Sequence, residues 1–98
     1  MQTFILLTKL TPELTKRIKE RSAIGENWLE LVKQKCPDVK FIGHYALLGQ
    51  YDFLDIYEAP DVESAAKVSM LSQANGAIHA ESLPAIPYKK FLELVKEI

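Results

Sequence analysis

The stretch YALLGQYDFLDIYEAP, residues 45–60, decides the fold of this chain. Two runs rich in aromatic and branched apolar residues suit pleated strands, and Gly49 between them can supply the positive φ that a tight connection needs. The stretch therefore predicts a β-hairpin, with strands over residues 38–48 and 51–58.

Upstream of the hairpin, residues 2–9 are apolar on both alternating sides and predict a strand with both faces covered. Thr11 and Pro12 then start a predicted helix that runs to Cys36, just before Pro37. Ser22 and Gly25 interrupt its apolar pattern; a kink, a short break and a second segment capped by Ser22 all remain open. The basic residues Lys16, Arg17, Lys19 and Arg21 are expected on its solvated face.

Downstream, residues 61–75 predict a helix capped by Asp61, and residues 77–83 predict a fourth strand. Pro84 and Pro87 are expected to bracket a turn before a short amphipathic C-terminal helix. The order is typical of a ferredoxin-like βαββαβ fold of the α+β class: a four-stranded antiparallel sheet with helices on one face, plus the added helix. Residues 1–98 form one domain in this prediction.

Composition favours a compact globular protein, because 48% of the 98 residues are hydrophobic and 26% are charged. A net charge of −1 disfavours nucleic acid as a partner, and no apolar run is long enough to cross a membrane. Cys36, the single cysteine, fits a reducing cytoplasm. The apolar run at residues 3–7 is too short for a signal peptide. We predict no cofactor, since no glycine-rich phosphate loop is present.

A two-residue turn at Gly49-Gln50 would pair His44 with Asp55 and Ala46 with Phe53. We expect this set to form the uncovered face of the sheet and the alternate set to pack under the helices. The uncovered set is Ile42, His44, Ala46, Leu48, Tyr51, Phe53, Asp55 and Tyr57, and the covered set is Phe41, Gly43, Tyr45, Leu47, Leu54 and Ile56. So broad an apolar surface predicts self-association into a homodimer or higher homo-oligomer.

The polar residues within that surface are the candidate site. His44, Asp55 and His79 are weak catalytic candidates, because a carboxylate can orient a histidine as general base. The expected binding residues are Tyr51, Phe53, Asp55, Tyr57, His44 and Glu81. The same groups could instead be hydrogen-bonded partners across a dimer interface. We predict no metal site, since the two histidines fall on opposite edges without a third ligand.

Gly49-Gln50-Tyr51-Asp52, followed by Glu58-Ala59-Pro60-Asp61, resembles the G-x-Y-D and E-A-P-D motifs of the GYD domain family. The resemblance implies a dimeric α/β barrel built from ferredoxin-like units, and it implies no particular reaction. Gly49, Tyr51 and Asp52 are the family motif residues. The carboxylate of Asp52 is expected to accept backbone N–H groups of a neighbouring segment.

Three functions follow as hypotheses. The first is binding of a small, mostly apolar or aromatic molecule without turnover. The second is a cofactor-free oxygenase or isomerase that uses His44 or His79 as base. The third is a regulatory or interaction module that binds a larger protein.

Overall fold

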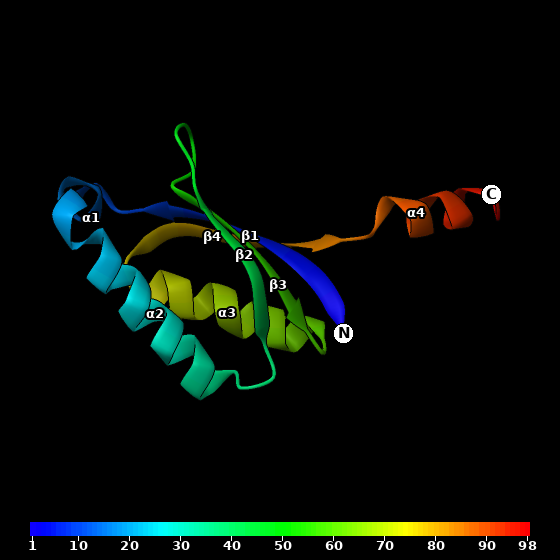
Figure 1. Ribbon diagram of the computed structural model, residues 1–98, viewed down its shortest axis with the longest axis horizontal. Coiled ribbons are helices and arrows are strands. Elements are labelled where there is room, and N and C mark those ends of the chain that lie inside the picture. The colour runs from blue at the N-terminus through cyan, green and yellow to red at the C-terminus, as the bar shows by residue number, and fades with distance from the viewer.

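The computed structural model covers residues 1–98 and has the predicted ferredoxin-like order. The elements are β1 (Gln2–Leu10), α1 (Pro12–Lys16), the 3-10 turn η1 (Ile18–Glu20), α2 (Arg21–Lys35), β2 (Lys40–Ala46), β3 (Phe53–Ala59), α3 (Val62–Ala74), β4 (Ala77–Ala85) and α4 (Tyr88–Val95). The antiparallel sheet has the order β2-β3-β1-β4, and α2 and α3 cover one face of it (Figure 1).

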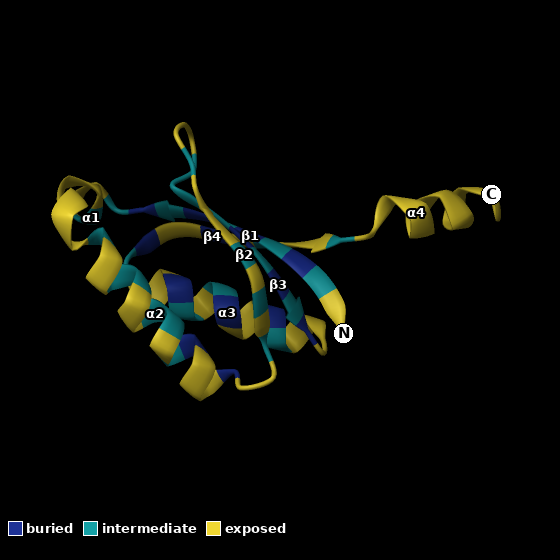
Figure 2. Cartoon of the chain, viewed as in Figure 1, coloured by how far each residue is buried: buried dark blue, intermediate teal, exposed yellow.

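The hydrophobic core fills the layer between the sheet and these two helices. Phe4, Leu6 and Tyr57 reach it from the sheet, and Val32 and Val68 reach it from the helices. All five are fully buried. Figure 2 shows buried positions along the strands and on α2 and α3. The rings of Phe4 and Tyr57 stack with centroids 5.5 Å apart, which joins β1 to β3 on the covered face.

The first helical region breaks earlier than the two predicted interrupting residues. Arg17, with φ −90° and ψ 54°, ends α1, and η1 leads into α2. Ser22 and Gly25 lie inside α2, so of the alternatives that the sequence left open, neither a break nor a cap occurs at these residues. A single glycine is tolerated within a helix at a cost of about 1 kcal/mol, which packing of the rest of α2 offsets.

The hairpin keeps the predicted register near its turn. His44 pairs with Asp55 and Ala46 pairs with Phe53, as predicted. The connection is longer than two residues, because β2 ends at Ala46 and β3 begins at Phe53. A β-bulge between Phe41 and Gly43 then shifts the register, so that Phe41 and not Ile42 lies opposite Tyr57.

The predicted assignment of the two sheet faces was wrong. Asp55 and Tyr57 are only 3% and 0% exposed, which places His44, Phe53, Asp55 and Tyr57 on the face covered by α2 and α3. Tyr45, Leu54 and Ile56 lie on the uncovered face, whereas Phe41 stays on the covered face because of the bulge. Both alternating sets of β3 are apolar, so alternation separated the faces without indicating which one the helices cover.

The C-terminal region also differs from the prediction. Pro84 lies within β4 and not in a turn, which an outer strand permits. Helix α4 then projects away from the body of the domain and covers neither face of the sheet (Figure 1). Its apolar residues Tyr88, Phe91, Leu92 and Val95 are all exposed. No helix is both long enough and apolar enough to cross a bilayer.

Candidate ligand pocket

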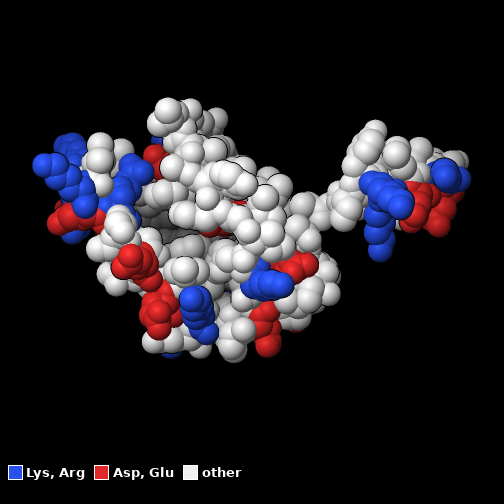
Figure 3. All heavy atoms as spheres, in the orientation of Figure 1, with Lys and Arg blue, Asp and Glu red and all other residues white.

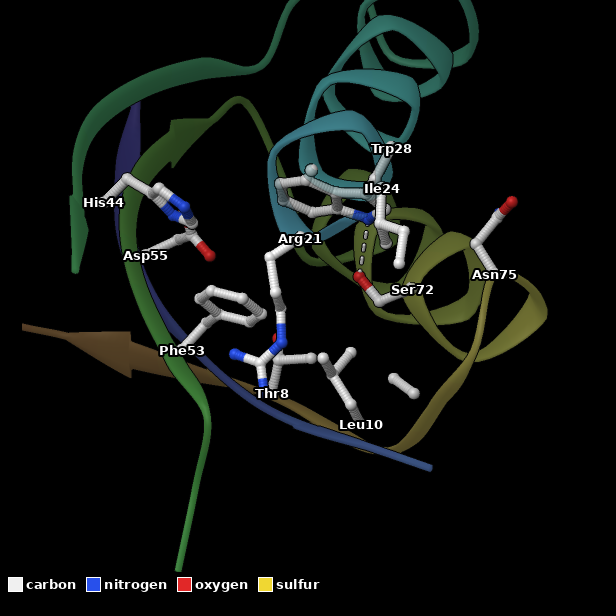
Figure 4. Close-up of a pocket in the computed structure, with 12 residues that line it drawn as sticks. Thr8, Leu10, Arg21, Ile24, Trp28, His44, Phe53, Asp55, Ser72 and Asn75 are labelled. Carbon is white, nitrogen blue, oxygen red and sulfur yellow. Dashed lines mark hydrogen bonds and ion pairs between the residues drawn. The ribbon is translucent and has the colours of Figure 1, made fainter. Parts of the chain in front are cut away.

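A pocket lies between the covered face of the sheet and the helices α2 and α3 (Figure 4). Its cavity has a volume of about 70 Å³, and a more open hollow of about 320 Å³ shares the lining residues Arg21, Gly25, Trp28, His44 and Asp55 with it. The lining side chains come from β1, α2, β2, β3, α3 and the residue after α3: Thr8, Leu10, Arg21, Ile24, Trp28, His44, Phe53, Asp55, Ser72 and Asn75. Concave sites lined mostly by apolar side chains with a few polar groups are where small molecules commonly bind.

One side of the pocket is an aromatic and aliphatic wall. Trp28 is fixed there because its indole N–H donates a 2.9 Å hydrogen bond to Ser72 Oγ on α3. The edge of the Trp28 ring also packs against Phe41, with centroids 5.3 Å apart. Ile24 and Leu10 complete this apolar lining. Trp28 therefore packs against the hydrophobic core and also borders the cavity.

His44 and Asp55 form a hydrogen-bonded pair at the pocket. His44 Nδ1 lies 2.5 Å from Asp55 Oδ1, and the His44 ring stacks on Phe53. The Asp55 side chain is 4% exposed, but that of His44 is 57% exposed. Burial raises the pKa of the Asp55 carboxyl, and the charge of His44 opposes this shift. The carboxylate fixes the imidazole orientation, which is the arrangement a histidine base requires.

Arg21, the first residue of α2, extends its side chain into the same pocket (Figure 4). Its guanidinium carbon lies 5.4 Å from the centroid of the Phe53 ring. Nη2 is 4.0 Å from Asp52 Oδ1, and Nε is buried without a hydrogen-bond partner. The sequence prediction that placed Arg21 on a solvated face was wrong. Its spacing of three and seven residues from Ile24 and Trp28 puts all three on one side of a helix, and this was the available signal.

The three family motif residues have structural roles at the hairpin. Gly49 adopts φ +153° in the connection. Asp52 Oδ2 accepts a 2.8 Å hydrogen bond from the backbone N–H of Leu10, as predicted for this carboxylate. The Tyr51 hydroxyl donates to Glu81 on β4 at 3.1 Å. Together these bonds tie the hairpin to the end of β1 and to the middle of β4.

The remaining predicted site residues lie elsewhere. Tyr57 is in the core, where its hydroxyl donates a 2.7 Å hydrogen bond to Ser82. His79 and Glu81 pair with Lys9 and Leu7 of β1 and lie on the uncovered face of the sheet, away from His44 and Asp55. No cluster of three or more possible metal ligands occurs in the chain.

Charged side chains are unevenly distributed around the pocket. Lys and Arg side chains gather over α1 and the start of the helical region, beside a hollow in the surface (Figure 3). Within this group Arg17 is paired with Glu20. The sheet surface seen in the same view is largely uncharged (Figure 3).

Fold and pocket together define a small ferredoxin-like α+β domain with a cavity under its helices. The chain belongs to the GYD domain family, whose profile matches residues 4–95. It is also 31% identical, over 98% of its length, to the "Glutamine synthetase and cystathionine beta-lyase binding protein" of Thermus thermophilus, and it spans the whole of that relative. No solved structure matches the chain significantly.

Proposed function

We propose that this protein is a binding module whose pocket takes up a small, mostly apolar or aromatic molecule without turnover. The observation that carries the proposal is the fixed ring of Trp28, which the hydrogen bond to Ser72 holds against the cavity. An apolar wall with a few convergent polar groups is the usual makeup of a small-molecule site. The ligand would lie between Trp28 and Phe53, within reach of Arg21 and the His44–Asp55 pair.

A blocking substitution tests this proposal. A Cβ added at Gly25 would meet nothing within 4 Å, and Gly25 lines the pocket. Gly25→Leu should therefore fill the cavity from α2 without disturbing the fold. Compounds that raise the melting temperature of the wild-type protein should not stabilise this variant. If such compounds stabilise both proteins equally, they bind elsewhere and the pocket loses its role.

The proposed module is a homodimer in the cytoplasm. On the uncovered face, Tyr45 and Leu83 are 58% and 45% exposed, and Ile5, Leu54 and Ile56 are only half-buried. The apolar residues of α4 are exposed as well. A second copy would remove both apolar surfaces from water, and this burial of apolar area favours association. Light scattering on purified protein tests the dimer, and a monomeric mass at tens of micromolar would contradict it.

A cofactor-free oxygenase or isomerase is a second candidate, favoured by the His44–Asp55 pair at the pocket. A histidine held by a carboxylate can remove a proton from a bound substrate. Incubating a bound compound with excess wild-type protein and with His44→Gln, followed by mass spectrometry and NMR, tests for turnover. A product formed by the wild type alone would favour the enzyme over the binding module.

Binding to a metabolic enzyme is a third candidate, and it is supported by the name of the Thermus relative. Gel filtration of the protein with glutamine synthetase and with cystathionine β-lyase of its own organism tests it. Co-elution would favour an interaction module, with the exposed α4 as the first segment to substitute.

A further inference from the structure

The geometry points to a carboxylic acid with a flat apolar body as the ligand of the pocket, with its carboxylate bound by Arg21. This inference rests on the proposed small-molecule function and specifies the chemistry of the ligand. It begins with an unmatched donor: Arg21 Nε is buried at the pocket and has no hydrogen-bond partner. A buried donor without an acceptor is costly, so a ligand that supplies the acceptor gains more than it would from solvent-exposed contacts.

The neighbouring acid does not satisfy this arginine. Asp52 approaches Nη2 only to 4.0 Å, and its other oxygen already accepts the backbone N–H of Leu10 at 2.8 Å. Asp55, the acid that lines the pocket, is engaged with His44 at 2.5 Å. Both neighbouring carboxylates therefore have partners, whereas the guanidinium keeps donors for a third acid. A planar guanidinium matches a carboxylate with two parallel hydrogen bonds, which a neutral amide cannot accept.

The position of Arg21 also specifies the rest of the ligand. Its guanidinium lies over the Phe53 ring, and Asp52 Oδ1 lies 4.0 Å from Nη2, so an aromatic face and one distant carboxylate hold the arginine at the pocket. Ile24 and Trp28 lie one and two turns further along α2 and border the same cavity. A carboxylate at Arg21 would therefore direct an attached flat apolar group toward Trp28.

The test compares matched acids and amides: benzoate, 1-naphthoate and 4-phenylbutyrate against their primary amides. The single tryptophan provides the readout, because Trp28 gives the one indole N–H signal in a proton–nitrogen NMR spectrum. We expect at least one acid to shift this signal and to bind roughly 10- to 100-fold tighter than its amide, the range of one charge-assisted hydrogen bond.

Variants assign the effect to one side chain. Arg21→Met should abolish the preference for the acid while leaving the indole signal dispersed, and Arg21→Lys should keep part of it. Arg17→Met is the matched control, since Arg17 pairs with Glu20 and does not line the pocket, and it should bind the acid as the wild type does. Equal or tighter binding of the amides would overturn the carboxylate while leaving a small-molecule pocket in place. No binding of any acid or amide would overturn both.

Discussion

His44 on β2 and Asp55 on β3 face each other across two strands with Nδ1 and Oδ1 only 2.5 Å apart, the acid buried and the base half-exposed. Burial destabilises the ionised form of the Asp55 carboxyl, and it raises the pKa of Asp55 even beside the histidine. A carboxyl with a raised folded-state pKa contributes stability that is complete below its unfolded pKa and is lost as pH rises through its folded pKa.

The pH dependence of unfolding should reveal this cost. Relative to Asp55→Asn, the wild type should lose stability as pH rises above 3.8, the ordinary pKa of the carboxyl. Urea unfolding of both proteins at several pH values measures the difference. His44→Gln removes the group that opposes the shift, so it should extend this loss to higher pH. Parallel pH profiles for the wild type and Asp55→Asn would contradict the prediction.

The buried hydroxyl of Tyr57 links the sheet to α3. It donates to Ser82 Oγ, and Ser82 in turn contacts Ser69 Oγ at 2.7 Å. Tyr57→Phe should lower the free energy of unfolding by about 1 kcal/mol, because a buried hydrogen bond is lost while the ring still fills the core. Tyr45→Phe is the control on the exposed face and should change stability by less than about 0.5 kcal/mol. Equal effects in urea unfolding would contradict the assigned role.

Two glycines should respond in opposite ways to substitution by alanine. Gly76 has φ +107°, and a Cβ there would collide with the Leu14 side chain, so Gly76→Ala should cost more than about 1 kcal/mol. Gly25 is helical and its Cβ would meet open space, so Gly25→Ala should stabilise the fold by about 0.5–1 kcal/mol. Thermal unfolding compares the two variants, and changes of the same sign would show that one backbone assignment is wrong.

Asp52 should stabilise the fold because its side-chain oxygen accepts a hydrogen bond, and not because of its negative charge. Asp52→Ala would leave the nearly buried N–H of Leu10 without an acceptor and should cost about 1–3 kcal/mol. Asp52→Asn keeps an acceptor oxygen and should cost less. Hydrogen exchange at the Leu10 amide measures the bond directly. If the Leu10 amide exchanged at the wild-type rate in Asp52→Ala, the hydrogen bond to Leu10 could not explain the role of Asp52.

The uncovered sheet face should tolerate no charge if it is the dimer interface. Ile56→Lys should convert the dimer into a monomer, because an unpaired charge would be buried between two apolar faces. Met70→Lys is the control: Met70 is 58% exposed on α3, on the helical side of the domain. Light scattering would give a halved mass for the first variant only. A mass unchanged by Ile56→Lys would place the interface elsewhere.

The sequence predicted the element order, the caps at Thr11 and Asp61 and the pairing of His44 with Asp55. These depend on local chemistry: hydroxyl and carboxylate caps, proline positions and a glycine connection. The family motif then agreed with the fold. The motif also located the hairpin correctly, since its glycine and aspartate have the backbone geometry and hydrogen bonding of a strand connection.

The sequence did not predict which face of the sheet the helices cover. Phe53 and Tyr57 are as apolar as Leu54 and Ile56, so the choice depended on packing against α2 that no local pattern contains. Arg21 was missed for a related reason. The break at Arg17 decides which residues of α2 face the sheet, and therefore that Arg21 reaches the pocket. From the sequence alone, a charged residue near a helix start is typical of a solvated surface.

The outer strands of the sheet have a consequence for the behaviour of the protein at high concentration. β2 carries the bulge near Ile42, and β4 contains Pro84, which has no N–H to donate. Both irregularities hinder a strand of another molecule from extending the sheet sideways. Growth into strand-paired fibrils is therefore disfavoured at both edges of the sheet. The apolar sheet face can stay exposed for association with a partner without making the chain prone to amyloid-like assembly.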